Sequence, residues 1–431
     1  MKILIITHSF SPELTPRAFR WAAIAARLTK LGHEVHVLCA AQLQAPEEAE
    51  FEVHRVADPI LKSRPATVPA PASSDRRGTW IDTLKSWTRS AFRTLWRSFY
   101  WPDYACGWIF PATRMARSLS GTHRFDWVIT TSHPFSGHLV WWLVRRTSAP
   151  SRWLVDIGDP YSFMRQPSPF NRRLYGLLSY WVEKRVIALA DRISVTTHAT
   201  ASLYQQNFSP ANGKTMVIPP LLSLPAPPLR TKQEDGILDL VFVGTLYRNL
   251  RSPRYLLECF SVFGQRFPES RFRLHFYGAV NDCHDILAEY ADHPHVTVLV
   301  HGLVDRAVVL HAMANADFLL NIGNHSASQL GSKVIEYMAM GRPIVNVVSI
   351  PDDISLDALS SYPSCFTISA RTGAISGDTL SLLAQFLLNP PTVLQEFAED
   401  VRRIYSAEEV TAQYLALMAE DLTIGSSSGN S

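Results

Sequence analysis

The sequence is poor in cysteine, and no cysteine lies in a spacing typical of a metal site. None belongs to a C-x-x-C or Cys/His pattern, so neither a disulfide framework nor a zinc site is indicated. Scattered cysteines in odd number fit a reducing compartment, and we expect a cytoplasmic protein. The five cysteines are Cys39, Cys106, Cys259, Cys283 and Cys365.

The sequence also lacks a long apolar run. A transmembrane helix needs ~20 consecutive apolar residues, and no stretch of the chain approaches that length. The opening run Ile3–Ile6 is soon interrupted by His8, Pro12 and Glu13, so it does not resemble a signal peptide. We interpret this run as a buried strand.

Charged residues make up 18% of the chain, an ordinary share for a globular protein, but the two signs are unevenly distributed. Residues 1–225 carry an excess of 12 positive charges, and residues 226–431 an excess of nine negative ones. A basic first half indicates an anionic partner, for which nucleic acid and anionic lipid are candidates. Because no nucleic-acid recognition motif is present, we expect no nucleic acid partner.

Apolar runs and helical periodicity alternate along the chain. Lys2–Thr7, Ala18–Leu31 and Glu34–Ala40 have the patterns of a strand, a helix and a strand, which together form a βαβ unit. One core rarely exceeds ~300 residues, so the length predicts two α/β domains. Further strands are expected at Trp127–Thr131, Trp153–Asp156, Arg192–Thr197, Asp239–Val243, Arg273–Tyr277, Val296–Leu299, Phe318–Ile322 and Pro343–Val347.

Five prolines in residues 217–229 indicate a stiff linker between the two domains. The Gly/Ser-rich end of the chain has the composition of a disordered tail. The expected organisation is an N-terminal acceptor-binding domain at 1–216, the linker at 217–229, a C-terminal nucleotide-sugar-binding domain at 230–395, helices at 396–423 that pack back toward the first domain, and a tail at 424–431.

Residues 80–100 interrupt the alternation with the pattern of an amphipathic helix. A basic face beside an aromatic and aliphatic face is typical of a helix that lies in a membrane interface. We therefore expect these residues to bind an anionic membrane surface; a helix that caps a domain is the alternative. The basic face consists of Lys85, Arg89, Arg93 and Arg97, and the apolar face of Trp80, Leu84, Trp87, Ala91, Leu95 and Phe99.

The stretch most informative about chemistry is Ser326–Pro343. A loop of small residues leads into a helix that starts near Ser332, and free N–H groups at a helix N-terminus bind phosphate. Gly331 permits a close approach of backbone to an anion, and Lys333 adds a positive charge. Glu336 lies one turn into the helix and offers acceptor oxygens to a ribose diol. The pattern predicts a nucleotide phosphate site.

This stretch resembles the donor-binding signature of the retaining glycosyltransferase family 4, which is approximately E-x-x-G-x-x-x-x-E-A-M-A-x-G-x-P. The residues in register with it are Gly331, Glu336, Met338, Ala339, Gly341 and Pro343. Further stretches that resemble the family, in the same order along the chain, are His8–Pro12, Leu31–Val35, Phe125–Ile129, Asp156–Pro160, Phe242–Thr245 and Ala314–Leu320.

The resemblance implies the GT-B fold, in which two Rossmann-like doubly wound parallel-sheet domains face a cleft. It implies transfer of a sugar, with retention, from a nucleotide diphosphate sugar. Relatives with a short S-K-x-x-E-Y signature, as at Ser332–Tyr337, are linked to surface-polysaccharide assembly. We therefore expect a lipid-linked or polysaccharide precursor as acceptor, at the inner face of the plasma membrane. The chain contains no Asp-x-Asp motif, and we expect no metal or other cofactor.

The resemblance also implies a donor site. Glu336 would hold the ribose, and the loop before it would contact the diphosphate and the sugar. Arg248 or Arg251, after the strand that ends at Gly244, would neutralise the diphosphate together with Lys333, because a planar guanidinium suits phosphate. The predicted donor-binding residues are Gly244, Arg248, Arg251, Ser328, Gln329, Leu330, Gly331, Ser332, Lys333 and Glu336.

The acceptor is expected on the N-terminal domain. His133, with His138 as second choice, would approach the reacting sugar, and a structural histidine is the alternative. Asp159 would bind an acceptor hydroxyl, or cap a helix instead. Arg17 and Arg20 would meet an acceptor phosphate. The predicted catalytic residues are His133, Arg248 and Lys333.

One departure from the signature affects the function. Ser328 stands where the family has its first Glu, which touches the donor sugar. This change leaves the nucleotide half of the site intact and favours an altered donor. A catalytically silent GT-B subunit docked at the membrane, and a GT-B sugar-nucleotide epimerase, are the alternative functions.

Overall fold

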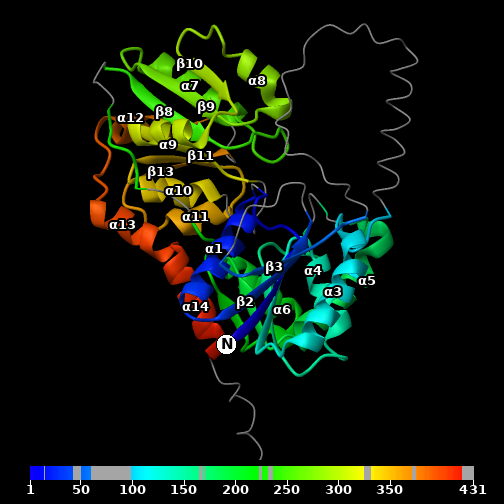
Figure 1. Ribbon diagram of the computed structural model, residues 1–431. Helices are drawn as coiled ribbons and strands as arrows, with labels where there is room; N and C mark the ends of the chain where they lie inside the picture. Colours follow the sequence, from blue (N-terminus) through cyan, green and yellow to red (C-terminus); the bar gives the residue numbers. More distant parts are fainter. Residues whose placement is uncertain are drawn as a thin grey trace, which may run out of the picture. The chain divides into compact units, whose positions relative to one another are not determined.

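The computed structural model describes residues 1–13, 15–41, 50–59, 99–164, 168, 170–222, 226–231, 236–324, 332–370 and 375–419. The chain divides into two compact units. The first contains Met1–Leu221 and the chain from Ala407 onward, and the second contains Leu222–Ser406. Each unit is built around one parallel sheet (Figure 1).

Seven strands form the sheet of the first unit: β1 (Lys2–Ile6), β2 (Glu34–Ala40), β3 (Glu52–Val56), β4 (Trp127–Ser132), β5 (Arg152–Ile157), β6 (Arg192–Val195) and β7 (Thr215–Val217). They lie in the order β3-β2-β1-β4-β5-β6-β7 and are all parallel. Its helices are α1 (Pro16–Lys30), α3 (Ile109–Thr122), α4 (Ser136–Val144), α5 (Arg172–Leu189), α6 (His198–Asn207) and α14 (Ala407–Ala419), with short 3-10 turns η1 (Cys106–Trp108) and η2 (Ser209–Ala211).

The surroundings of strand β1 explain why its residues 3–6 are all apolar. Leu4 and Ile6 belong to the core that includes α3 and α4, whereas Ile3 and Ile5 belong to the core that includes α1 and α14. Both faces of the strand are therefore buried under helices, which is the environment that selects continuous apolar runs in parallel sheets. The predicted buried strand is confirmed.

Six strands form the sheet of the second unit: β8 (Leu238–Val243), β9 (Phe272–Tyr277), β10 (Thr297–Gly302), β11 (Phe318–Ile322), β12 (Ile344–Val348) and β13 (Cys365–Ser369). Their order is β10-β9-β8-β11-β12-β13, again all parallel. Its helices are α7 (Arg254–Arg266), α8 (His284–Ala288), α9 (Arg306–Asn315), α10 (Ser332–Met340), α11 (Ile354–Leu359), α12 (Gly377–Leu388) and α13 (Gln395–Ile404), with the 3-10 turn η3 (Asn281–Cys283).

In both sheets the chain first adds strands on one side of its first strand and then adds the later strands on the other side. The strand order reverses between β1 and β4 in the first unit, and between β8 and β11 in the second. This is the doubly wound Rossmann arrangement, so the predicted fold class is confirmed. Ligands of such sheets bind beyond the carboxyl ends of the strands at the point of reversal.

Sequence reasoning missed three of the four outer strands, namely β3, β7 and β13, whereas the outer strand β10 was predicted at Val296–Leu299. β3 pairs with β2 at the edge of the sheet, and three of its five residues, Glu52, His54 and Arg55, are polar or charged. It has no apolar run because it is half exposed at the edge of the sheet. The short β7 and the outer strand β13 were missed for the same reason.

The end of the chain returns to the first unit through one buried polar network. Arg20 on α1 donates to Tyr414 on α14 at 2.8 Å and to the carbonyl oxygens of Ile218 and Pro219 at 3.4 and 2.8 Å. Tyr414 in turn donates to Asp156 at 2.7 Å. The expected helical segment 396–423 thus contains α13, which belongs to the second unit, and α14, which belongs to the first.

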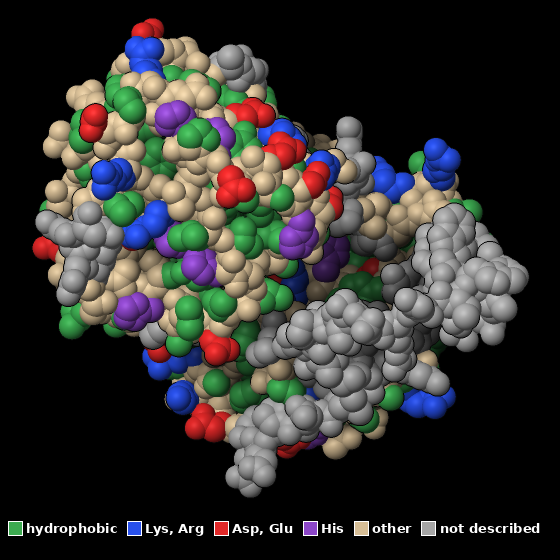
Figure 2. All heavy atoms as spheres, turned by 90° about the horizontal axis from the view of Figure 1, so that it is seen from above, with side chains coloured by type: hydrophobic (Ala, Val, Ile, Leu, Met, Phe, Trp, Pro, Cys, Tyr) green, Lys and Arg blue, Asp and Glu red, His purple; other side chains and the backbone are tan. Residues whose placement is uncertain are grey.

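The predicted membrane helix at 80–100 falls almost entirely outside the described residues, as does the tail at 424–431. Within the described part of the chain, no helix has both the length and the apolar character needed to cross a membrane. On the described part of the face in Figure 2, acidic and basic side chains are interspersed, so the charge difference between the two halves does not appear there as a patch of one sign.

We expect the Gly278→Ala variant to be strongly destabilised. Gly278 follows β9 with φ of 125°, and a Cβ on it would overlap the carbonyl oxygen of Gly244 at the end of β8. The strained backbone and the overlap together should lower the free energy of unfolding by about 3 kcal/mol or more. Urea unfolding followed by circular dichroism measures this, because all eleven tryptophans lie in the first 181 residues and do not report on the second unit.

The matched control is Gly377→Ala at the start of α12. There a Cβ meets only the end of the flexible Arg266 side chain, at 3.4 Å. A Gly278→Ala protein as stable as this control would contradict the close approach of the two loops.

Candidate active site

In the second unit, a cationic side chain lies at the point where the strand order reverses. Arg251, in the loop after β8, donates through Nε and Nη2 to the side-chain oxygen of Asn324, which follows β11, at 3.1 and 2.8 Å. A Cβ on Gly244 would lie only 3.1 Å from Nη1 of Arg251, so the glycine lets the guanidinium approach the end of β8. Burial lowers the pKa of Arg251 below the usual value of an arginine.

The first turn of α10 carries a lysine and a glutamate at the same edge of the sheet. Nζ of Lys333 lies 2.7 Å from Oε2 of Glu336, and the glutamate is only 6% exposed. Tyr337 anchors the helix, because its hydroxyl accepts from the backbone N–H of Val243 at 2.8 Å and donates to the carbonyl of Val243 at 3.2 Å. The Lys333–Glu336 pair is thereby held next to the end of β8.

Asp353 joins this edge from the loop before α11. Its Oδ1 accepts from the backbone N–H of Ser355 at 2.8 Å, whereas its buried Oδ2 has no hydrogen-bond partner among the residues that the structure describes. Gly323 leaves the space that this carboxylate occupies. Burial raises the pKa of Asp353 above its usual 3.8. An unsatisfied buried oxygen of this kind is typical of a ligand site.

The first unit gathers three of the predicted acceptor residues at its own point of reversal. His133 follows β4, Asp159 follows β5, and Arg17 lies in the first turn of α1. Nη2 of Arg17 is 3.6 Å from Oδ2 of Asp159, and Gly158 leaves room for the guanidinium. In the described part of the chain, Nη1 of Arg17 and Nε2 of His133 are buried without a hydrogen-bond partner. Buried nitrogens without a partner call for a water or a ligand that completes their hydrogen bonds.

Two family models match the chain over most of these two units. Residues 18–220 match the glycosyl transferase 4-like domain, and residues 238–354 match the glycosyl transferases group 1. The chain is a group 1 glycosyltransferase. A comparison with curated proteins found no match.

Solved structures share the GT-B fold of this glycosyltransferase at low sequence identity. The lipopolysaccharide outer core galactosyltransferase WaaB is 13% identical, with 97% of this chain and 99% of that chain covered and a TM-score of 0.59. The E. coli trehalose-6-phosphate protein bound with UDP-2-fluoro glucose is 11% identical, with 98% and 100% covered and a TM-score of 0.58. A glycosyltransferase from Rickettsia africae is 9% identical, with 97% of both chains covered and a TM-score of 0.55.

Of the two candidate arginines of the transferase's donor site, the structure places only Arg251 beside Gly244. Arg248 points to the η3–α8 segment, where Nη2 donates to both carboxylate oxygens of Asp285 at 2.6 and 2.7 Å and to the carbonyl of Asp282 at 2.9 Å. Its side chain is 44% exposed. These contacts favour a structural role for Arg248 and leave Arg251 as the better candidate for the diphosphate.

Arg20 and His138 are buried in the first unit of the transferase, below the edge where His133 lies. Arg20 is committed to the network with Tyr414, which favours a structural role over binding of an acceptor phosphate. His138 lies on α4, where Nδ1 is 2.6 Å from the hydroxyl of Thr130 in the middle of β4. Burial lowers the pKa of His138 to about 3, so the ring is neutral.

Part of the predicted donor loop lies outside the described residues. This part contains Ser328, Gln329, Leu330 and Gly331, and Ser332 begins α10. Sequence reasoning missed Asn324 and Asp353, although each follows an apolar strand closely, which is the signal that could have indicated them.

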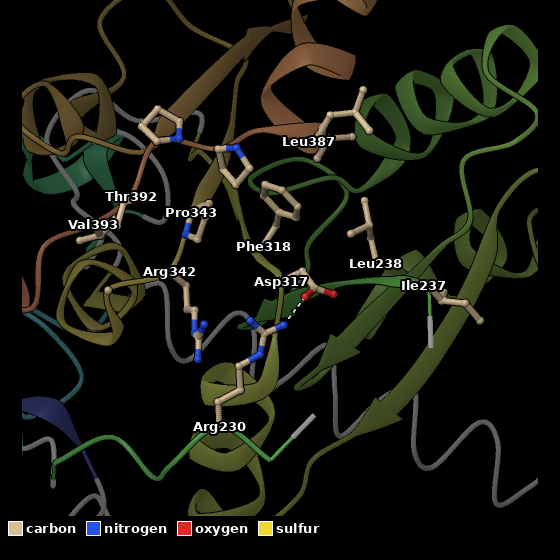
Figure 3. A pocket seen from close by; sticks show the side chains of 15 residues that line it. Arg230, Ile237, Leu238, Asp317, Phe318, Arg342, Pro343, Leu387, Thr392 and Val393 are labelled. Atoms are coloured by element: carbon tan, nitrogen blue, oxygen red, sulfur yellow. Dashed lines mark hydrogen bonds and ion pairs between the residues drawn. The ribbon is translucent and has the colours of Figure 1, made fainter. Parts of the chain in front are cut away.

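The second unit also has a pocket of about 700 Å³ that is separate from the donor edge (Figure 3). Its lining includes Leu238, Phe318 and Pro343, which lie at the amino ends of β8, β11 and β12. Arg230 and Asp317 form an ion pair across it. Because ligands of doubly wound sheets bind at the carboxyl ends, this pocket is not the donor site.

We expect the pKa of His133 to lie below 6.5 and to respond to its neighbours in opposite directions. Burial, followed by the charge of Arg17, lowers this pKa, whereas Asp159 raises it. Arg17→Met should therefore raise the pKa, and Asp159→Asn should lower it further. NMR titration of the ring protons, assigned with His133→Gln, measures both shifts.

The same pKa shift makes folding stability depend on pH. The unfolded chain binds a proton at His133 more readily than the folded chain does, so this group destabilises the fold as pH falls below 6.5 and has no effect well above it. If Arg17→Met and Asp159→Asn shifted the pKa of His133 in the same direction, the observed arrangement of these three side chains would be contradicted.

Proposed function

We propose that this glycosyltransferase takes its sugar from a nucleotide diphosphate sugar bound at the carboxyl edge of the second sheet. The observation that carries the proposal is the Lys333–Glu336 pair on the first turn of α10, at the point of reversal where Arg251 also lies. Two cations and a helix N-terminus suit a diphosphate, and a glutamate one turn further suits the ribose. The structure of the E. coli neighbour holds a bound UDP sugar, which is in keeping with this proposal.

In the proposed complex Lys333 leaves Glu336 and binds a phosphate oxygen. Glu336 is then free to accept hydrogen bonds from the ribose hydroxyls, so binding exchanges an internal ion pair for two contacts with the ligand. Glycosyl transfer has an oxocarbenium-like transition state, and negative charge develops on the leaving diphosphate. Arg251, Lys333 and the N-terminus of α10 would stabilise that charge.

We propose a metal-independent mechanism with retention of configuration. Metal independence is supported by the absence of an Asp-x-Asp motif and by the cations Arg251 and Lys333 at the proposed diphosphate site, whereas retention rests on the resemblance to the retaining family alone. Asp353 is added to the donor site as a group that would accept a hydrogen bond from a sugar hydroxyl, since its Oδ2 has no partner in the described residues. The carboxylate of Asp353 would supply part of the contact with the donor sugar that the family's glutamate makes and that Ser328 does not.

We propose that the acceptor is a lipid-linked or polysaccharide precursor. Arg17, His133 and Asp159 together offer a cation, a ring nitrogen and a carboxylate, which suit an acceptor that carries both phosphate and hydroxyl groups. The neighbour WaaB is a lipopolysaccharide outer core galactosyltransferase, which is in keeping with an acceptor of this class.

We further propose that the enzyme works as a peripheral protein on the cytoplasmic face of the plasma membrane. Helix α5 supports this, because four large apolar side chains form one exposed stripe along it, and basic residues flank the stripe. This is the composition of a helix that lies in a membrane interface. The stripe consists of Leu174, Leu177, Leu178 and Trp181, of which Leu177 is 90% exposed; the basic residues are Arg172, Arg173, Lys184 and Arg185.

Thermal unfolding with UDP, GDP, CMP and ADP tests the donor site. A ligand at about a hundred times its dissociation constant stabilises the folded state by about 2.7 kcal/mol, which shifts the transition by several degrees. We expect a shift with one nucleoside diphosphate, and an affinity about tenfold or more lower in Glu336→Ala and in Arg251→Met. The matched control is Arg254→Met, because Arg254 is paired with Glu289 on the surface at 2.9 Å.

Two further results would change the assignment. A loss of nucleotide affinity in Arg248→Met but not in Arg251→Met would restore Arg248 as the phosphate ligand. No shift with any nucleotide would favour the silent, membrane-docked subunit. The epimerase alternative predicts turnover of the nucleotide sugar without an acceptor.

Sedimentation with vesicles that contain anionic lipid tests the membrane proposal. We expect the double variant Leu177→Ser/Trp181→Ser to bind several-fold more weakly, because it removes the centre of the α5 stripe. Leu388→Ser is the control, since Leu388 is 76% exposed on the second unit. Charge reversal at Arg89, Arg93 and Arg97 tests the segment 80–100 separately, and unchanged sedimentation of all these variants would refute membrane docking.

A further inference from the structure

A cluster of histidines and glutamates lies at the amino end of the first sheet, away from the proposed acceptor residues. His36 is the third residue of β2 and is fully buried, and Glu52 and His54 lie on the adjacent strand β3. The pairing register places His36 opposite Glu52, and Leu38 opposite His54. Side chains two residues apart point to the same face of a strand, so both histidines and Glu52 face the same side of the sheet.

The three side chains bring their ligand atoms close together. Nδ1 of His36 lies 3.2 Å from Nε2 of His54 and 3.2 Å from Oε2 of Glu52, and the last two atoms are 3.6 Å apart. Ligand bonds of ~2.0–2.2 Å in a tetrahedral zinc site place neighbouring ligand atoms ~3.3–3.6 Å apart. The observed triangle therefore has the dimensions of one face of such a tetrahedron.

The remaining nitrogen of His36 has the partner that a metal-bound histidine usually has. Nε2 lies 3.1 Å from Oε1 of Glu34, which also pairs with Lys2 at 2.7 Å. Metal-ligating histidines generally donate their second ring N–H to a carboxylate, which orients the ring and directs the other nitrogen at the metal. With Nε2–H donating to Glu34, Nδ1 of His36 presents a lone pair toward Glu52 and His54.

We propose that His36, His54 and Glu52 form a binding site for one divalent transition metal ion of the zinc type. Imidazole and carboxylate ligands in this number favour such an ion over Mg²⁺ or Ca²⁺, which prefer oxygen ligands alone. The side chain of Glu52 is 65% exposed and that of His54 is 21% exposed, so the fourth position is accessible to water. The ion would replace the contact between the nitrogens of the two parallel rings, whose planes differ by 4°.

The charges around the site are compatible with binding of a cation. Glu34 and Glu52 are negative, Lys2 pairs with Glu34, and the ring of His123 packs against the ring of His36 with their centroids 4.5 Å apart. The second set of possible ligands, Glu34, His36 and His123, shares His36 but has Lys2 beside it, which disfavours a cation there.

The site would join edge strand β3 to its neighbour β2. This role is separate from sugar transfer, because Glu34, His36 and Glu52 lie toward the amino ends of their strands. The proposed metal-independent chemistry at the carboxyl ends is unaffected by it.

Calorimetric titration of the chelator-treated full-length protein with zinc chloride tests the proposal. We expect one equivalent to bind, and cobalt chloride to produce the strong visible absorption of a tetrahedral site. His54→Gln and Glu52→Gln should each weaken zinc binding by about tenfold or more, and Glu34→Gln should weaken it by ~10-fold through loss of ring orientation. Zinc should also raise the unfolding temperature of the parent protein and not that of His54→Gln.

The matched control is His301→Gln in the second unit. Nδ1 of His275 and Nε2 of His301 lie 3.0 Å apart, but Asp239 contacts the other ring nitrogen of His275. Among the described residues, no carboxylate therefore joins these two nitrogens in a set of three ligand atoms. Equal loss of zinc in this control would show binding to surface histidines and overturn the proposal. Absence of stoichiometric binding, or unchanged binding in both Glu52→Gln and His54→Gln, would overturn it as well. Because Glu52 is largely exposed, its variant should fold even where His54→Gln does not.

Discussion

The constraint on which this enzyme depends is that each sheet is parallel and buried on both faces. Parallel strands need long crossover connections, and the helices in these connections cover both sides of the sheet. Leu4 and Ile6 face one core while Ile3 and Ile5 face the other, so neither face of the inner strand β1 is open to a ligand. The proposed sugar transfer therefore takes place at the strand ends. His133, Asp159, Gly244 and Asn324 all follow the last residue of a strand.

The buried charged side chains are of two kinds, which differ in how many hydrogen bonds they make within the protein. Arg20 donates to Tyr414, Ile218 and Pro219, and these contacts hold α14 and residues 218–219 against α1. Arg17, one turn earlier on the same helix, has a long contact with Asp159 and a guanidinium nitrogen with no partner among the described residues. Burial without full pairing is costly, and such a group is stabilised when a ligand supplies the missing contact.

The second unit shows the same division. Arg248 is paired with Asp285 on the surface, whereas Arg251 is partly buried and contacts Asn324 at the point of strand reversal. Lys333 pairs with the buried carboxylate of Glu336, and in the proposed complex a ligand replaces one partner of this pair. The amino edge of the first sheet differs in kind, because there histidines and carboxylates face one another directly, which is an arrangement suited to a cation and not to a phosphate.

The sequence by itself determined the two α/β domains and most inner strands, because a strand buried on both faces must be apolar along its length. It also indicated the proposed phosphate-binding turn of α10, since Lys333 and Glu336 are neighbours in the sequence as well as in space. Only the tertiary structure decided which arginine lies beside Gly244, that Arg20 contacts Tyr414, and that Asp353 and Asn324 lie at the same edge of the second sheet. The same holds for His36, Glu52 and His54, which lie near one another only because β2 and β3 pair in one register. Contacts between separate strands and loops depend on register and burial, and neither leaves a local pattern in the sequence.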